Sequence, residues 1–483
     1  MLLPVSLPPA VQARLAARVG DAEISYGALY AAAAAHAASL ASMGAAPGAR
    51  VGVWATPAIE TVVAFVGHAL GGYVSVPINP ASGPREVAHV VGDAGLGAVA
   101  GEAPPDGVAG ARVVRVDPAG SGPASAFVEV GADAPALVLY TSGTTGAPKG
   151  AVLTHRNVAS NLDALAAVWA WTAEDVLAHA LPLFHVHGLA LGLFGPLRRR
   201  GSVRVLPRFE PGAVCAAMGA EATMFFGVPT MYHRLAEHIE RDLAAARALR
   251  KARVLVSGSA PLPSRDHARV EAATGRRLLE RYGLTETLIN TAVALHDEPP
   301  HGSVGRALPG VELRLVDDAR SPVVDEDAMG EVAVRGPSVF AGYLDRPEAT
   351  RAVLDEQRWF YTGDVATRDA AGFVKIVGRK ATDIIKTGGF KVGAGEVEAA
   401  LLEHPEVREA AVRGVADDDL GERIEAWVVL SEGAEAEGDA LSGFVAERLA
   451  WHKRPRRVHV AEALPRNAMG KVVKSALRGP EGS

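Results

Sequence analysis

Two periodicities of hydrophobic and polar residues alternate along the first part of the chain. Short apolar runs rich in β-branched side chains predict buried strands, and longer segments with apolar residues at helical spacing predict helices. Strands that alternate with helices favour an α/β fold, in which helices cover a mainly parallel sheet. The predicted strands cover residues 51–54, 74–78, 136–140, 203–206 and 253–256, and the predicted helices cover residues 26–43 and 59–70.

The pattern changes from about Gly302 onward. Residues 311–316 and 331–334 form short alternating segments that are bounded by turn residues. Such segments predict an antiparallel or β-barrel-like subdomain, which we expect to complete the large N-terminal domain.

The remainder of the chain predicts a second, smaller domain. A charged stretch follows Arg379, residues 396–404 predict a helix, and residues 433–438, made only of Gly, Ala and Glu, predict a surface loop. About a hundred residues suffice for one small α+β domain. We therefore expect an N-terminal domain of residues 1–379 and a C-terminal domain of residues 380–483.

Composition narrows the class of protein. A chain of 483 residues is too long for one core, and 49% hydrophobic with 22% charged residues is typical of a soluble globular protein. The net charge of −6 gives no indication of a nucleic-acid partner or an anionic membrane surface. The single cysteine, Cys215, excludes an intramolecular disulfide, and no Cys/His spacing resembles a zinc site.

The sequence pattern gives no indication of a targeting segment. Residues 1–10 are apolar but contain three prolines and no positive charge, so they do not resemble a signal peptide. No uncharged apolar run reaches the length of about 18 residues that a membrane span needs. We expect a cytoplasmic protein that is a monomer or a weak homodimer.

A loop rich in glycine and hydroxyl groups follows the predicted strand 136–140. Glycines let backbone N–H groups approach an anion, hydroxyl groups donate hydrogen bonds, and a lysine adds positive charge. The spacing is not that of a P-loop, in which Ser or Thr follows the Lys. We expect this loop to bind a polyphosphate; a mobile loop without a ligand is the alternative. Its residues are Thr141, Ser142, Gly143, Thr144, Thr145, Gly146, Lys149 and Gly150.

A second segment, residues 281–287, reads Arg-Tyr-Gly-Leu-Thr-Glu-Thr. Tyr282 offers a flat apolar face for an adenine ring. Thr285 can hydrogen-bond an α-phosphate, and Glu286 is a hard oxygen ligand suited to Mg²⁺ that bridges phosphates. The alternative is a helix N-terminus that Thr285 caps.

Both segments resemble core motifs of the adenylate-forming superfamily, which includes acyl-CoA synthetases, nonribosomal adenylation domains and luciferases. Further segments resemble its motifs in the same order: Ser-Gly-Ser-Ala-Pro at 257–261, Tyr-Thr-Gly-Asp at 361–364 and Pro-Arg-Asn-Ala-Met-Gly-Lys at 465–471. The resemblance implies ATP and coenzyme A as substrates and Mg²⁺ as cofactor. Besides the loop, it implies nucleotide contacts from Ser259, Ala260, Glu280, Arg281, Tyr282, Gly283, Thr285, Asp364 and Arg379.

The resemblance also implies individual roles. Asp364 and Arg379 would contact the ribose, although Asp364 by itself would read as a turn-capping residue. Lys471 would be the catalytic lysine, with its ammonium between the attacking carboxylate and the α-phosphate; the alternative is an exposed lysine near a frayed terminus. The other implied roles are catalysis by Glu286 and Thr285 and metal binding by Glu286 and Thr145.

Residues 385–398 resemble the glycine-rich stretch past the interdomain hinge of that superfamily. The resemblance implies that the small domain rotates between two half-reactions and that the arm of coenzyme A passes this stretch. Gly389 lies ten positions after Arg379, one more than expected, so several residues qualify as the hinge. The implied coenzyme A contacts are Lys386, Gly388 and Gly389, and the hinge candidates are Lys380, Ala381 and Thr382.

Residues 181–188 and 227–234 occupy the place where the related enzymes line the acyl pocket. Helical spacing puts Arg234 beside the apolar stripe of its predicted helix and His233 roughly opposite. An unpaired arginine in an apolar wall is costly unless it meets an anion, such as the second carboxylate of a short diacid. The alternative is a salt bridge to a nearby acidic residue: Glu237, Glu240 or Asp242.

These acyl-pocket segments also resemble those of bacterial malonyl-CoA synthetases. We expect malonate or methylmalonate as the acid, activated as an acyl-adenylate and transferred to coenzyme A with release of AMP and pyrophosphate. The expected acyl-binding residues are His187, Arg234, Ser259 and Ile289.

Three other readings stay open. A synthetase for a short-chain or aryl monocarboxylate would differ only in the acyl pocket. A nonribosomal adenylation domain would favour an aspartate for an amino group. A non-catalytic nucleotide-binding regulator would have lost Glu286 or Lys471, and the sequence contains both.

Overall fold

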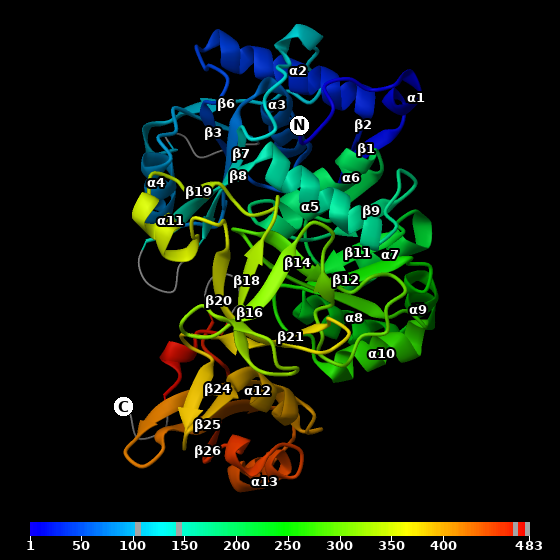
Figure 1. Ribbon diagram of the computed structural model, residues 1–483. Coiled ribbons are helices and arrows are strands. Elements are labelled where there is room, and N and C mark those ends of the chain that lie inside the picture. The colour runs from blue at the N-terminus through cyan, green and yellow to red at the C-terminus, as the bar shows by residue number, and fades with distance from the viewer. Residues whose placement is uncertain (102–107, 142–146, 467–471, 479–483) are drawn as a thin grey trace.

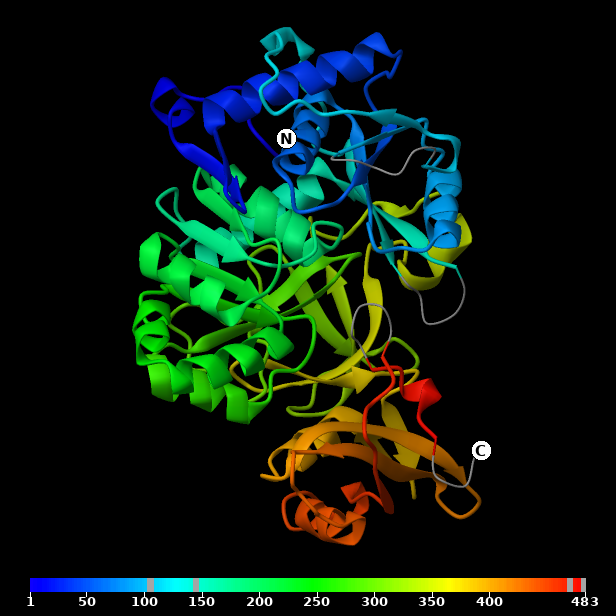
Figure 2. The ribbon, with the colours of Figure 1, turned by 180° about the vertical axis from the view of Figure 1, so that it is seen from behind.

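The computed structural model describes residues 1–101, 108–141, 147–466 and 472–478. A large part is built mainly of two parallel-type sheets and their helices, and a small part lies below it in Figure 1. The red C-terminal segment runs from the small part back toward the large part, as Figure 2 shows. No helix of the described residues combines the length and the apolar character that crossing a membrane requires.

The first sheet has seven strands, and the blue N-terminal third of the chain supplies most of them. In spatial order they are β19 (Gly342–Tyr343), β8 (Lys149–Thr154), β7 (Pro135–Thr141), β4 (Val74–Ile78), β3 (Arg50–Trp54), β5 (Ala98–Ala100) and β6 (Arg112–Val114). The strands from β7 to β6 run parallel, whereas β8 returns antiparallel to β7 and carries the two-residue strand β19 at the edge.

The second sheet has nine strands, six of which form its parallel centre. In spatial order they are β15 (Arg306–Ala307), β14 (Leu288–Ala292), β13 (Leu278–Leu284), β12 (Val254–Gly258), β11 (Met224–Gly227), β9 (Val176–His179), β10 (Ser202–Val205), β1 (Leu15–Val19) and β2 (Ala22–Ser25). The carboxyl ends of β11, β12 and β13 lie at one edge, the usual place for a ligand site in such sheets.

Helices cover both sheets. In chain order they are α1 (Pro9–Gln12), α2 (Tyr26–Ser42), α3 (Ile59–Gly71), α4 (Pro84–Asp93), α5 (His155–Val168), η3 (His187–Phe194), α6 (Gly195–Arg199), α7 (Pro211–Ala220), α8 (Pro229–Arg241), α9 (Leu243–Leu249), α10 (Ser264–Thr274) and α11 (Pro347–Val353), with short 3₁₀ turns η1 (Val108–Gly110) and η2 (Ala124–Ala126). Helix α3 is buried on every side, because nearly all of its residues are apolar.

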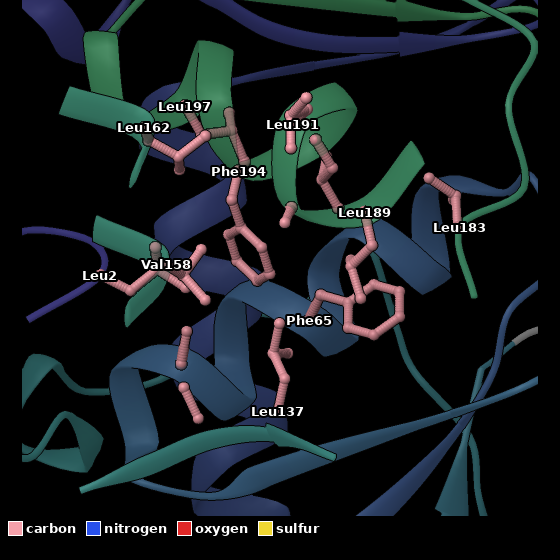
Figure 3. Close-up of a cluster of buried hydrophobic side chains, with 14 of the residues drawn as sticks. Leu2, Phe65, Leu137, Val158, Leu162, Leu183, Leu189, Leu191, Phe194 and Leu197 are labelled. Atoms are coloured by element: carbon pink, nitrogen blue, oxygen red, sulfur yellow. The ribbon is translucent and has the colours of Figure 1, made fainter. Parts of the chain in front are cut away.

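The main core lies where α3, α5 and η3 meet. Figure 3 shows Phe65 of α3 facing Phe194 of η3, with their ring centroids 6.4 Å apart, and Val158 of α5 and Leu137 of β7 nearby. Leu2 from the N-terminal segment packs into the same cluster. This apolar contact joins the two sheets into one large domain.

The expected antiparallel subdomain is a five-stranded sheet. In spatial order its strands are β17 (Pro322–Val323), β16 (Glu312–Val316), β18 (Gly330–Arg335), β20 (Phe360–Arg368) and β21 (Val374–Arg379), all antiparallel. Strands β15 and β19, which lie next to it in the chain, pair with the two larger sheets instead. The subdomain is therefore connected to both of them.

The small part is an α+β unit with its own apolar core. Its strands are β23 (Phe390–Gly393), β22 (Ile384–Thr387), β25 (Gly421–Leu430), β24 (Val407–Asp417) and β26 (Arg457–Val460), and its helices are α12 (Ala394–Leu402), α13 (Gly438–Ala446) and the turns η4 (Trp451–Lys453) and η5 (Lys474–Ala476). The α/β class and the predicted elements are confirmed, and residues 433–437 form the expected loop. The chain makes a turn between β21 and β22, where the domain boundary at residue 379 is expected.

Candidate active site

The hydroxyl- and glycine-rich loop connects two paired strands. Thr141 ends β7 and lies opposite Lys149, which begins β8. Ser142, Gly143, Thr144, Thr145 and Gly146 lie outside the described residues. The Lys149 ammonium lies 5.3 Å from the ring centroid of Tyr343, so Lys149 lies beside strand β19.

Glu286 lies at the same place. Its carboxylate is buried and accepts a hydrogen bond of 2.7 Å from the hydroxyl of Tyr343, and its carbonyl accepts one from the N–H of Phe340. Tyr343 therefore connects Glu286 to Lys149. Glu286 would hold Mg²⁺ through its carboxylate, a hard oxygen ligand, and the other metal candidate, Thr145, lies outside the described residues.

Residues 281–287 form a strand and a tight hairpin rather than a helix N-terminus. Gly283 is required there, because a Cβ at this position would lie only 1.8 Å from the carbonyl oxygen of Leu288. The turn leaves Thr285 half-buried next to Glu286, and the Glu286 carboxylate contacts Tyr343, which lies beside Lys149.

The three candidates for the nucleoside come together in one hydrogen-bonded set. Tyr282 donates its hydroxyl to Asp364 at 2.6 Å, and the Nε of Arg379 lies 2.9 Å from the other carboxylate oxygen. Asp364 lies in strand β20 opposite Arg379 of β21, so strand register fixes the pair. The 5% exposed Asp364 is thus oriented from two sides.

Arg281 has the least expected environment. Its side chain is 6% exposed, yet none of the described carboxylates lies within ion-pairing distance, and its Nε has no hydrogen-bond partner among the described residues. Among the described residues, its guanidinium donates a hydrogen bond of 3.3 Å to the hydroxyl of Ser259. Burial lowers the pKa of the Arg281 guanidinium to about 10, so the group stays charged near neutrality.

Gly258 makes room for that guanidinium. A Cβ at Gly258 would lie 2.5 Å from the Arg281 Nε, so only glycine lets the side chain lie across the end of β12. Ser259 follows with φ of +75°, a left-handed conformation that is uncommon for serine. The strained turn presents the Ser259 hydroxyl to Arg281, and Ala260 follows on the exposed side.

His187 faces the same space. It begins the π-helical segment η3, a local form that often marks functional sites, and neither of its ring nitrogens has a partner among the described residues. Burial, and then the neighbouring Arg281 charge, hold the pKa of the His187 imidazole well below its ordinary value. The neutral imidazole and the charged guanidinium both have unsatisfied hydrogen-bonding groups among the described residues. Together they could bind an anion whose oxygens accept hydrogen bonds.

The other two acyl-pocket candidates, Ile289 and Arg234, differ in their exposure to solvent. Ile289 is buried in β14, and Asn161 of α5 holds its backbone through hydrogen bonds of 2.7 and 3.2 Å. Arg234 of α8 is exposed, and its guanidinium lies 5.2 Å from the ring centroid of Phe209.

The acidic residues considered as partners of Arg234 are engaged elsewhere. Glu237 lies near His233, Glu240 pairs with Arg269, and Asp242 caps α9. Arg234 therefore has no ion pair within the part of the chain that the structure describes.

Glu280 stands beneath the Ser259 turn. Its carboxylate accepts a hydrogen bond from the N–H of Leu262, and burial, only partly offset by that hydrogen bond, raises its pKa from 4.5 to about 7. The Glu280 carboxylate is therefore hydrogen-bonded to the loop that carries Ser259 and Ala260.

Glu280→Gln is expected to alter the pH dependence of stability. Because the pKa is raised on folding, the native state binds more protons, and the stabilisation is full below about pH 4.5 and lost as the pH rises through about 7. Glutamine stays neutral, so the thermal unfolding midpoint of the variant should rise relative to that of wild type as the pH increases from 5 to 8. An unchanged difference across that range would contradict this.

The hinge candidates lie in the turn between β21 and β22, and the coenzyme A candidates follow within the small part. Lys386 is in β22, and Gly388 and Gly389, with φ of +55° and +83°, form the turn to β23. The Lys380 ammonium lies 2.9 Å from carboxylate oxygens of both Asp318 and Glu331. Ala381 and Thr382 continue the exposed turn, and Lys471 lies outside the described residues.

The sequence patterns did not predict two features of this region, Tyr343 and the ion pairs of Lys474. Tyr343 sits in a two-residue edge strand, and only its position after a run of turn residues singles it out. Lys474, with its carboxylate partners, has no motif that the sequence alone isolates.

Two protein-family models match this chain. Residues 9–344 match the family model "AMP-binding enzyme", and residues 396–471 match "AMP-binding enzyme C-terminal domain". The chain is 36% identical to a malonate–CoA ligase of Arabidopsis thaliana over 480 residues, which cover 90% of this chain and 78% of the relative.

Two solved structures resemble the whole chain. One is a malonyl-CoA ligase in a ternary product complex with methylmalonyl-CoA and AMP: 52% identity, TM-score 0.73, covering 96% of this chain and 99% of that one. The other is ATP-bound MatB from Rhodopseudomonas palustris: 36% identity, TM-score 0.88, covering 96% and 95%. Because both family models match in chain order and the first spans more than half of the residues, this chain belongs to the AMP-binding enzyme family.

Proposed function

We propose that this protein ligates malonate or methylmalonate to coenzyme A in two steps. In the first, a carboxylate oxygen attacks the α-phosphorus of ATP, the bond to the β-phosphate breaks, and pyrophosphate leaves. In the second, the thiol of coenzyme A loses its proton and attacks the acyl carbon, and AMP leaves. The relatives named as malonate–CoA and malonyl-CoA ligases support this reaction.

The geometry supports a role for each part in the first step. Tyr282, Asp364 and Arg379 would hold the nucleoside, and the loop with Lys149 would bind the leaving phosphates. Bound Mg²⁺ on Glu286 would neutralise phosphate charge. Phosphoryl-group chemistry of this kind depends mainly on positioning and charge stabilisation, and no protein nucleophile is required.

A rotation of the small domain would separate the two steps. The product complex shares 52% identity with this chain but a TM-score of 0.73, whereas the ATP-bound structure shares 36% and scores 0.88. A higher sequence identity together with a lower TM-score is expected when two domains keep their folds but change their relative placement. The boundaries 1–379 and 380–483 and the hinge within Lys380, Ala381 and Thr382 are part of this proposal.

The choice of a dicarboxylate rests on one observation: the buried Arg281 guanidinium has no acidic partner among the described residues. Removing one partner of a buried ion pair typically costs about 3–5 kcal/mol, so such a charge calls for an anion from outside the chain. We propose that Arg281, His187 and Ser259 bind the distal carboxylate, with Arg234 at the exposed margin. This assignment moves Arg281 from the nucleotide to the acid.

The test is an assay of AMP formation over short mono- and dicarboxylic acids with ATP, Mg²⁺ and coenzyme A. Malonate or methylmalonate is expected to exceed acetate and propionate in kcat/KM by about a thousandfold or more, because a site that binds a polar group rejects analogues lacking it. Preference for a monocarboxylate would leave the ligase reaction standing and remove the dicarboxylate. A cytoplasmic location and a monomer or weak homodimer stay predictions.

A further inference from the structure

Lys474 lies between two carboxylates at the junction of the two domains. Its ammonium is 3.0 Å from an oxygen of Asp383 and 2.7 Å from an oxygen of Glu398, and all three side chains are about four-fifths buried. Burial by itself would lower the pKa of Lys474, but the two carboxylates raise it above its ordinary value. The lysine therefore stays charged and bridges the two acids.

Each acid belongs to a different element. Asp383 follows the hinge candidates directly: it accepts a hydrogen bond from the N–H of Arg379 at 3.1 Å and returns one to the Arg379 carbonyl at 2.8 Å. Glu398 projects from α12, and its carboxylate accepts a hydrogen bond of 2.8 Å from the N–H of Val412. Lys474 thus connects the turn after Arg379 with the body of the small domain.

The backbone beside Lys474 leads to the segment that contains Lys471. Arg466 and Val472, the described residues on either side of 467–471, pair with each other, and the N–H of Val473 bonds to the carbonyl of Pro465 at 2.8 Å. Lys474 therefore lies two residues after the bridge between Arg466 and Val472.

The opposite side of the turn is attached to the large domain. Lys380 pairs with Glu331 of β18, and the same carboxylate accepts the N–H of Gly363, next to Asp364. Asp364 in turn pairs with Arg379. A continuous set of polar contacts therefore runs from the proposed ribose contacts, through the turn, to Lys474.

We propose that Lys474 is a positioning residue for adenylate formation: by bridging Asp383 and Glu398 it fixes the paired residues Arg466 and Val472, which flank Lys471 in the chain. The inference rests on the proposed role of Lys471. Leu464 and Leu477 pack in an apolar cluster with Trp427, whose indole N–H donates to the Arg478 carbonyl at 2.8 Å. These contacts keep the C-terminal segment attached when the ion pairs are removed.

The experiment compares Lys474→Gln with wild type in two half-reactions. We expect kcat for adenylate formation to fall about a hundredfold, the loss typical of a displacement of about 1 Å, with the KM values for ATP and acid nearly unchanged. Thioester formation from supplied malonyl-adenylate should change by less than about threefold, because Lys471 acts before that step. Lys474→Arg, which keeps the charge, should recover most of the rate, and Asp383→Asn should reproduce part of the loss.

Lys453→Gln is the matched control. It removes a 2.6 Å ion pair to Glu396 on the same helix, and the side chains of Lys453 and Lys474 are 22% and 21% exposed. Its adenylation rate should stay near that of wild type. Equal losses in both half-reactions, or full adenylation in folded Lys474→Gln, would overturn the inference. If Lys471→Ala lowers adenylation and Lys474→Gln does not, only this inference fails.

Discussion

Lys471→Ala is expected to lower acyl-adenylate formation by a factor of about 10² to 10³ while thioester formation from supplied acyl-adenylate survives. Negative charge develops on the α-phosphate oxygens as the carboxylate attacks, and removing a positioned donor for such charge typically costs about 2.7–4 kcal/mol of barrier. Pyrophosphate release with ATP and malonate measures the first step, and conversion of malonyl-adenylate with coenzyme A measures the second.

Lys375→Ala controls for the loss of one positive charge. Lys375 is an exposed lysine of β21 outside the proposed site, so both rates should stay at the wild-type level. If Lys471→Ala slowed both half-reactions equally, the lysine would act in both steps or in folding, and its proposed role would be wrong.

Arg281→Gln is expected to reduce kcat/KM for malonate by about a thousandfold or more and to change that for propionate far less. The buried guanidinium has no carboxylate from the described residues, so a substrate anion that it binds gains a strong charge-assisted hydrogen bond. Propionate has no second carboxylate and loses nothing. Steady-state kinetics with both acids at saturating ATP measure the ratio.

The same experiment separates the acid from the nucleotide. If Arg281 contacts ATP, the variant should raise the KM for ATP equally with either acid, and the assignment to the acyl pocket would be wrong. Arg277→Gln, at an exposed position just before β13, is the control. Arg234→Ala is expected to give a smaller selective loss for malonate, because the exposed arginine is well solvated.

Local patterns predicted most of the fold. The apolar runs at 74–78 and 136–140 are strands β4 and β7, and the apolar segment at 59–70 is the buried helix α3. These elements follow from side-chain periodicity, which acts within a few residues. Division into two larger sheets depends on which strands pair across long separations, and periodicity carries no such information.

The acyl pocket shows the same limit. Helical spacing on α8 singled out Arg234, and the structure places its side chain at the surface beside Phe209. Arg281 has equal charge and lies in a recognisable motif, but its burial depends on Gly258 of the neighbouring strand and on the turn at Ser259. The packing of neighbouring strands therefore decides which of the two arginines is buried away from solvent.

By itself the sequence predicted the chemical inventory of this protein: a loop for phosphates, an acidic metal ligand, an aspartate and an arginine for the ribose, and a C-terminal catalytic lysine. Each of these predictions came from a short local motif. Only the tertiary structure decided that Tyr343 joins Glu286 to Lys149, that Arg281 is buried without an acidic partner from the described residues, and that Lys474 bridges Asp383 and Glu398. The physical reason is that burial and ion pairing depend on contacts between residues far apart in the chain, which no local pattern specifies.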